Sequence, residues 1–496
     1  MGALISRLTD IQSHLDALAR QHRVPGAALG VFAGDEFVEF ATGVLNRDLG
    51  VDATPDSLFQ IGSNTKLLTA TLVMQLVDQG QVDLDEPVRT YLPDFRVASE
   101  KDSAAITVRH LLTHTSGIQG DHFDDHGRGD ECIEHYVASL AGLRNVHEPG
   151  ELFSYCNSGF VTLGYLVERL TGEAYHDVLR ERVLRPLGMR TTTVLAEEVI
   201  GRRVAIGHVV TGGSGPDPVV APRPMMARSS SPAGSLTWST PRELLAFARA
   251  HVALGVGPNG TRILSTDAAR AMQQPQQKLP PGVGLADAVG LAWMLQDWSG
   301  HRLIRHGGGT IGQLSFLEVL PDDDFGVCLL TNSATGGLLW RDLARYLFGD
   351  FAGIVPPTVA KPPPDRPKLD LDTYAGTYQR LGVSYEVVPV RAAGGLKLTI
   401  RSSGALAPPD APPVEVELTA IDHERFHLRV PPVGTETLAT FLFPDRNGRP
   451  KFLHLGGRAS RRVAAPPAAT RAKKATKAKK ATKATKAKRT AGGRVR

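Results

Sequence analysis

The stretch HRLIRHGGGTIGQLSFLEVLPDDDFGVCLLTN, residues 301–332, contains three apolar runs separated by turn signals. A glycine cluster ends the first run, and Pro321 with three aspartates separates the second from the third. Short apolar runs bounded by glycine, proline and aspartate are typical of β-strands. The stretch therefore predicts three strands at the C-terminal end of a larger domain.

A matching hairpin is predicted near the N-terminus, after an amphipathic first helix. Segments 27–33 (AALGVFA) and 36–43 (EFVEFATG) flank Gly34-Asp35, a tight-turn signal. Between the hairpin and the C-terminal strands, apolar residues at helical spacing predict helices over 63–79, 107–113, 132–143, 158–171 and 241–254. This order indicates an α/β (α+β) domain in which the first and last strands join in one antiparallel sheet flanked by helices.

The chain divides at a proline-rich segment. Residues 356–368, which include PPTVAKPPPDRP, predict a stiff linker after a first domain of residues 1–355. Residues 369–463 contain short alternating segments between turns and predict a small all-β domain, a barrel or a sandwich. Residues 464–496 are rich in Lys, Ala and Thr, have nothing apolar to bury, and predict a disordered tail.

The charge of the chain is distributed unevenly. Of 496 residues, 42% are hydrophobic and 22% charged, which excludes wholesale disorder and a collagen-like fibre. The net charge of +5 combines a tail with twelve Lys or Arg and no acid with a body of about −7. Such a tail predicts nonspecific binding to nucleic acid or another polyanion, with a role in solubility as the alternative.

Cysteine content and hydropathy bear on the compartment. Cys132, Cys156 and Cys328 are too few and too scattered for a zinc cluster or a disulfide framework. The N-terminal segment lacks the apolar core of a signal peptide, and no stretch approaches the roughly 20 apolar residues that span a bilayer. We therefore expect a cytoplasmic protein with no membrane span.

The first candidate for chemistry is Ser63-Asn64-Thr65-Lys66 at the start of a predicted helix. Residues three apart share a helix face, so the Lys66 amine can reach the Ser63 hydroxyl and activate it as a nucleophile. Taken alone, the same pattern also fits a capped surface helix.

The second candidate is Tyr155-Cys156-Asn157, just before an apolar helix. A tyrosine beside a cationic lysine can have a lowered pKa and act as a base. Asn157 could orient Lys66 or a substrate amide. The alternative is a buried aromatic side chain followed by a turn asparagine.

The third candidate is His306-Gly307-Gly308-Gly309, which follows the predicted strand RLIR. Glycines there allow a ligand to approach the backbone closely. The N–H of Gly309 could form an oxyanion hole with that of Ser63. A flexible turn is the alternative.

Together the three patterns, S-x-x-K, Y-x-N and H-x-G, resemble the serine hydrolases of the class C β-lactamase and penicillin-binding-protein superfamily. The resemblance covers roughly residues 10–350 and includes LFQIGSNTKLLTA and PGELFSYCNSGFVTLGYLVERLTG. It implies a β-lactamase/transpeptidase-like fold, with Ser63 as acyl-forming nucleophile, Lys66 and Tyr155 as the proton-transfer pair and Asn157 as an orienting group. The loop at Gly308-Gly309 would bind substrate, and the second domain would be a lipocalin-like barrel.

Two positions depart from the family pattern. β-Lactamases of this kind carry K-T-G where this chain has His306, and an unperturbed His is mostly neutral at pH 7. Recognition of a substrate carboxylate at the third motif is therefore weakened, as in esterases and D-amino-acid amidases of the superfamily. Cys156 is interpreted as a small filler whose side chain points away from the pocket rather than as a second nucleophile.

The stretch DHFDDHGRGDECIEH, residues 121–135, gathers acids and histidines. We interpret it as a solvated loop at the rim of the pocket rather than a metal site, because the proposed chemistry requires no metal or cofactor. His110 and His114, in RHLLTHTSG, are expected to be structural.

The predicted function is therefore a serine hydrolase that cleaves ester or amide bonds through an acyl-enzyme. Carboxylesterase ranks first, then D-amino-acid peptidase or amidase, then β-lactamase, with a small ester, amide or D-amino-acid peptide as substrate. The alternative from another class is a non-catalytic protein that carries its tail to DNA. The intact set of Ser63, Lys66, Tyr155 and Asn157 counts against that alternative.

Overall fold

The structure is a computed structural model that describes residues 4–211, 217–283, 286–405 and 412–463, so the predicted tail lies outside the described residues. The α-helices are α1 (Leu8–Gln21), α2 (Thr65–Asp78), α3 (Val88–Tyr91), α4 (Glu100–Ala105), α5 (Val108–Leu112), α6 (Cys132–Ser139), α7 (Asn157–Thr171), α8 (Tyr175–Leu179), α9 (Pro241–Val252), α10 (Thr266–Met272) and α11 (Gly336–Leu347). Among these described helices, none combines the length and apolar character needed to cross a membrane.

The large sheet joins the two ends of the first domain, as the sequence predicts. Its strand order is β3-β2-β1-β13-β12-β11-β10-β9-β8. The strands are β1 (Gly26–Ala33), β2 (Glu36–Asn46), β3 (Val51–Asp52), β8 (Gln277–Lys278), β9 (Ala288–Val289), β10 (Met294–Trp298), β11 (His301–Gly309), β12 (Leu314–Leu320) and β13 (Phe325–Thr331). β1 pairs antiparallel with both β2 and β13, with Gly30 opposite Cys328, which confirms the predicted fold class.

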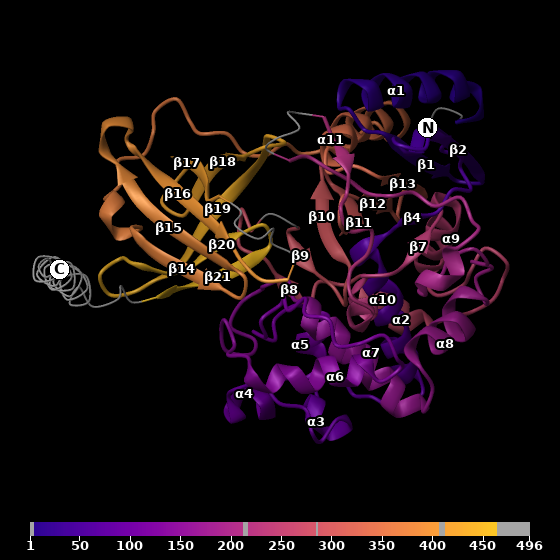
Figure 1. Ribbon diagram of the computed structural model, residues 1–496, viewed down its shortest axis with the longest axis horizontal. Coiled ribbons are helices and arrows are strands. Elements are labelled where there is room, and N and C mark those ends of the chain that lie inside the picture. Colours follow the sequence, from indigo (N-terminus) through magenta and orange to yellow (C-terminus); the bar gives the residue numbers. More distant parts are fainter. Residues whose placement is uncertain (1–3, 212–216, 284–285, 406–411, 464–496) are drawn as a thin grey trace, which may run out of the picture.

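Helices cover both faces of this sheet (Figure 1). In β1, Ala27, Leu29 and Val31 join the apolar cluster that includes α1 and α11. Ala28 and Phe32, on the other face, join the cluster around α2, α7 and α9. Because successive side chains of a strand point to opposite faces, burial of both faces makes β1 apolar along its whole length.

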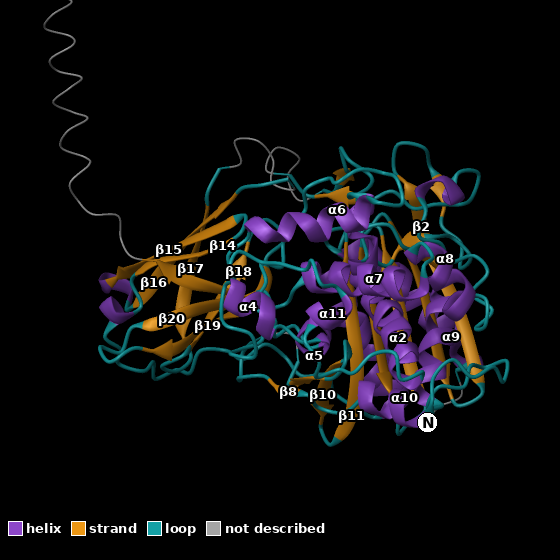
Figure 2. Cartoon of the chain, turned by 90° about the horizontal axis from the view of Figure 1, so that it is seen from below, coloured by secondary structure: helices purple, strands orange, loops and turns teal. Residues whose placement is uncertain are grey.

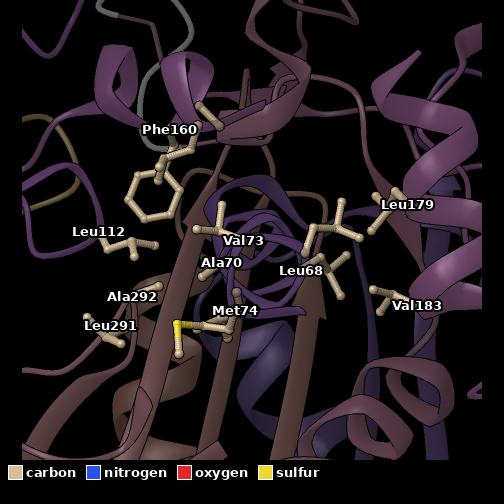
Figure 3. Close-up of a cluster of buried hydrophobic side chains, with 14 of the residues drawn as sticks. Leu68, Ala70, Val73, Met74, Leu112, Phe160, Leu179, Val183, Leu291 and Ala292 are labelled. Carbon is tan, nitrogen blue, oxygen red and sulfur yellow. The ribbon is translucent and has the colours of Figure 1, made fainter. Parts of the chain in front are cut away.

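Helix α2 is a core helix. It is buried on nearly all sides, and Figure 3 shows Leu68, Val73 and Met74 among side chains from other elements, including Leu112 of α5 and Phe160 of α7. Seen from below, α2 and α7 lie together against the sheet (Figure 2). This burial excludes a surface helix as the explanation of the Ser63–Lys66 pattern and fixes that pattern rigidly in the core.

Residues 376–463 form a closed antiparallel barrel, which confirms the barrel alternative of the sequence analysis. Its strands are β14 (Gly376–Arg380), β15 (Val383–Val390), β16 (Gly395–Ser402), β17 (Val414–Ala420), β18 (Arg425–Val430), β19 (Thr435–Pro444), β20 (Pro450–Leu455) and β21 (Arg458–Val463), and β14 pairs with β21 to close it. Tyr378, Phe426 and Phe441 fill its interior. The barrel lies beside β8–β10, at the edge of the large sheet (Figure 1).

The barrel is docked directly against the segment that leads into α7. Tyr155 N donates to Gly457 O at 2.9 Å, and Ala459 N donates to Ser154 Oγ at 3.2 Å. Apolar side chains of both domains share one buried cluster at this interface, including Phe153 and Phe452. The turn between β20 and β21 is therefore held next to the second candidate motif.

Candidate active site

Ser63 and Lys66 meet at the start of α2. Ser63 lies in a short 3₁₀ turn, Gly62–Asn64, that leads into the helix. Lys66 is fully buried, and its Nζ lies 3.1 Å from Ser63 Oγ. Nζ also donates to Asn157 Oδ1 and to Ala233 O, each at 2.7 Å. The structure thus brings the first and second motifs together around one amine.

The environment of Lys66 favours its neutral form. Burial lowers the pKa of Lys66 well below its usual value, and the positive charge of Arg458 acts in the same direction. The rings of Tyr155 and Phe160 lie 4.9 and 5.6 Å from Nζ. A neutral amine has two N–H groups and one lone pair. With both N–H groups donated to Asn157 and Ala233, the lone pair faces Ser63 and can accept its proton.

Tyr155 is placed differently from the expectation for a base. Burial raises the pKa of Tyr155, and the smaller effects of Ser63 and Arg458 in the other direction do not offset it. The expectation that a neighbouring lysine lowers this pKa is therefore wrong. Its hydroxyl lies near Ser63, but no described group is aligned to form a hydrogen bond with it, so the protonated phenol can donate to a reacting group. His114 stacks on the Tyr155 ring at 4.2 Å and accepts from Cys156 N at 3.0 Å.

Cys156 caps α7 and is turned into the core. Its Sγ accepts from Gly159 N at 3.2 Å and lies 3.5 Å from Ile118 O. Burial raises the pKa of the Cys156 thiol to about 11. A buried, protonated thiol is a poor nucleophile, which agrees with the filler role expected for this residue.

The glycine loop at the end of β11 packs against the backbone of the Ser63 turn. Gly62 has φ +50°, and a Cβ on it would lie 2.5 Å from Gly309 N. A Cβ on Gly308 would lie 1.9 Å from Ile61 O. Only glycines permit this approach, which brings the Gly309 N–H beside Ser63, where an oxyanion hole would need it.

His306 is buried below this loop and carries no charge. Its side chain is 2% exposed, and Nδ1 lies 2.7 Å from Gly307 O. Burial lowers the pKa of His306 to about 3. His306 also does not line the cavity over Ser63. The third motif therefore places a neutral, enclosed imidazole where the resemblance has a lysine.

A cavity of about 160 Å³ opens over Ser63. It is lined by Ser63, Phe123, Asn157, Met226, Ser230, Ala233, Gly234, Ser235, Gly309, Thr310, Ile311 and Arg458. Two larger cavities, of about 430 and 570 Å³, share Phe123 as a wall and extend along the barrel and along residues 223–228. The site thus has space for a substrate that continues beyond the group attached to Ser63.

Two charged residues of the site, Arg458 and Asp121, were not among the site residues predicted from the sequence. Arg458 begins β21 of the barrel, and its guanidinium lies 5.0 Å from the centre of the Tyr155 ring. Asp121 bonds to Arg458 Nε at 3.0 Å. Nothing local marks Arg458, but Asp121 stands in the acidic stretch that was interpreted as a rim loop.

Most of the rest of that stretch is exposed, as expected for a loop, but His122 is buried. His122 is 7% exposed and its Nε2 lies 2.8 Å from Ser139 Oγ and 3.2 Å from His126 Nε2. Within the described ranges, no group of three or more His, Cys, Asp or Glu side chains is arranged to hold a metal ion.

A buried amine whose lone pair faces a serine at the start of a core helix is the arrangement of serine hydrolases that form an acyl-enzyme. The α+β fold narrows the class to the β-lactamase and penicillin-binding-protein superfamily. The family model described as Beta-lactamase matches residues 11–348, and the chain belongs to this family.

Relatives and solved structures agree with this assignment. Penicillin-binding protein 4 of Amycolatopsis lactamdurans is 42% identical over 373 residues, which are 75% of this chain and 97% of that protein. The crystal structure of SurE has a TM-score of 0.74 at 28% identity and covers 93% of this chain and 100% of its own; a second SurE structure contains D-Leu. D-amino acid amidase from Ochrobactrum anthropi SV3, complexed with D-phenylalanine, has a TM-score of 0.56 at 27% identity and covers 66% of this chain and 92% of its own.

Proposed function

We propose that this protein cleaves a peptide or ester bond next to a D-amino acid that carries a free carboxylate, through an acyl-enzyme on Ser63. The observation that carries the proposal is the position of Arg458 in the wall of the cavity over Ser63. Its side chain is 25% exposed, its Nε donates to Asp121 and its Nη1 donates to Gly456 O at 3.1 Å. A guanidinium in this position offers a carboxylate the charge-assisted bond that a neutral His306 cannot supply.

The proposed reaction follows from the resting protonation states. Neutral Lys66 takes the proton of Ser63, and Oγ attacks the carbonyl carbon while the N–H groups of Ser63 and Gly309 stabilise the oxyanion. Tyr155, protonated at rest, donates to the leaving nitrogen or oxygen and recovers a proton from Lys66. Water then attacks the acyl-enzyme by the reverse path and releases the acid.

The presence of Arg458 in the cavity wall changes the order of the candidate activities that was based on the sequence. Carboxylesterase ranked first because the third motif has no lysine. Arg458 supplies a positive charge in the wall of the cavity. SurE and the D-amino acid amidase, whose structures contain D-amino acids, resemble this chain. We therefore place D-amino-acid peptidase or amidase first. Carboxylesterase is the second candidate, because Met226 and Ile311 give the cavity an apolar wall for an uncharged acyl group.

The test compares matched substrates on the full-length protein. N-acetyl-D-alanyl-D-leucine should be hydrolysed faster than its L-leucine isomer and than its C-terminal amide, which lacks the carboxylate. Arg458→Gln should remove the preference for the free acid, which we expect to be about tenfold or more. Ser63→Ala should abolish both turnover and fluorophosphonate labelling. Equal rates on the acid and the amide, or faster turnover of nitrocefin or short p-nitrophenyl esters, would refute the substrate assignment.

We also propose that residues 464–496 bind polyanions such as DNA in the cytoplasm. Twelve positive charges without an aromatic residue support attraction to phosphate but no recognition of base sequence. Removing this segment should abolish salt-sensitive retention on DNA and leave hydrolysis unchanged. Retention that survives the truncation would contradict the proposal.

A further inference from the structure

Asp121 occupies a junction between the two domains and the active site. Its carboxylate accepts from Asn157 Nδ2 at 3.2 Å, from Arg458 Nε at 3.0 Å and from Arg380 Nη1 at 2.5 Å. Asn157 begins α7 of the first domain, whereas Arg380 and Arg458 stand on strands β14 and β21 of the barrel. The Asp121 carboxylate therefore connects Asn157, which accepts from Lys66, with Arg458, which lies against the Tyr155 ring.

The other titratable groups around Lys66 are neutral near pH 7. Burial raises the pKa of Tyr155 and raises that of Cys156 to about 11. Burial also lowers the pKa of His114 well below its usual value and that of His306 to about 3. These four groups therefore shape the site without placing a charge next to the amine.

Besides burial, which is the largest effect on the pKa of Lys66, the charges of Arg458 and Asp121 act on it, and Asp121 is also bonded to Arg380. Asp121 raises the pKa of Lys66, and Arg458 lowers it. Asp121 does not line the cavity over Ser63, whereas Arg458 and Asn157 do. Asp121 is thus placed to act on the reaction through its two neighbours rather than through contact with substrate.

We infer that Asp121 is a positioning residue that holds Arg458 and Asn157 in register and balances the charge of Arg458 on Lys66, so that docking of the barrel sets the reactivity of Ser63. The inference rests on the proposed function in taking Ser63 as nucleophile and Lys66 as its base. The alternative is that Asp121 only fastens the two domains together. Lys451 and Glu151 form such a fastening ion pair across the same interface.

The experiment measures the rate of fluorophosphonate labelling of Ser63 against pH in the full-length protein. If Lys66 must be neutral to react, the rate falls on the acid side as Lys66 gains its proton. Asp121→Asn should move this acid limb to lower pH, because it removes the charge that favours protonated Lys66. Arg458→Gln should move it to higher pH. In the double variant the two shifts should largely cancel, although Arg380 then lacks its carboxylate partner. Lys451→Gln, the matched interface control, should not move the limb.

Opposite shifts that cancel in the double variant support the inference, because a purely structural role gives losses of the same sign that add. The inference is wrong if both single variants shift the acid limb of the labelling rate in the same direction, or if Asp121→Asn leaves that limb at the wild-type pH. If wild-type Ser63 is not labelled at all, the proposed function fails. The inference is then tested by the pH dependence of the unfolding free energy. In Asp121→Asn, the rise of this free energy with pH that is linked to Lys66 should begin at lower pH than in wild type. If it begins at the same pH, the inference is wrong.

Discussion

Substituting Lys66 by Met should remove a pH dependence of stability that the wild-type protein carries. Burial lowers the pKa of Lys66 in the folded protein, whereas the unfolded chain titrates near 10.4. Between these two values the unfolded chain binds a proton that the folded protein does not. Stability therefore rises with pH over this window, by about 1.4 kcal/mol per pH unit for one proton, and the contribution is lost as pH falls towards the lowered folded pKa.

The four tryptophans allow this effect to be measured in the first domain alone, because Trp238, Trp293, Trp298 and Trp340 all precede the linker. Urea unfolding followed by tryptophan fluorescence at pH 8.5 and 9.5 should give wild type about 1 kcal/mol more increase in unfolding free energy than Lys66→Met. Lys101→Met is the control, since its side chain is 76% exposed on α4. Parallel behaviour of wild type and Lys66→Met would show that the buried amine is charged, and the assignment of Lys66 as the base would fail.

Three further substitutions test the site. Tyr155→Phe should slow acyl-enzyme formation by about 10²–10⁴-fold in stopped-flow labelling. The unfolding free energy should stay unchanged or rise, because the hydroxyl has no aligned hydrogen-bond partner among the described residues. A slower reaction with reduced stability would instead indicate misfolding. Gly308→Ala should abolish labelling of Ser63 and lower the melting temperature, because a Cβ would lie 1.9 Å from Ile61 O; an active, stable variant would show that the loop can move. His306→Lys should destabilise the protein and create no nitrocefin turnover, because the new amine would be enclosed beside Lys66 rather than in the cavity. Efficient nitrocefin hydrolysis by this variant would show that the side chain at residue 306 reaches the cavity.

Local sequence patterns were sufficient for most of the fold. The Gly34-Asp35 turn and the apolar runs of 301–332 predict strands that pair in the structure as β1, β2 and β11–β13. Strands β8 and β9 were not predicted, because two residues each are too few to show alternation. They form because β9 pairs with the edge strand β10 and β8 then pairs with β9, and this tertiary pairing is not visible in the local sequence.

The candidate site was predictable only where its residues lie in short motifs. Ser63 and Lys66 are three residues apart, so helix geometry alone brings them together. Asp121 and Arg458 are 337 residues apart, and their contact requires the barrel to close and dock. The protonation state of Tyr155 was also wrong from sequence, because the dominant effect is burial, which a motif does not report.

The position of Arg458 on the last described strand sets the order in which the site is completed during synthesis. Tyr155 leaves the ribosome about 300 residues before Arg458, and Ser63 and Lys66 leave it about 390 residues before Arg458. β14 cannot close the barrel until β21 has been made. A nascent or prematurely terminated chain therefore carries Ser63 and Lys66 without Arg458, the cation to which we assign substrate selection. The cavity over Ser63 therefore gains its Arg458 wall only after β21 has been made, although Ser63, Lys66 and Tyr155 are made much earlier.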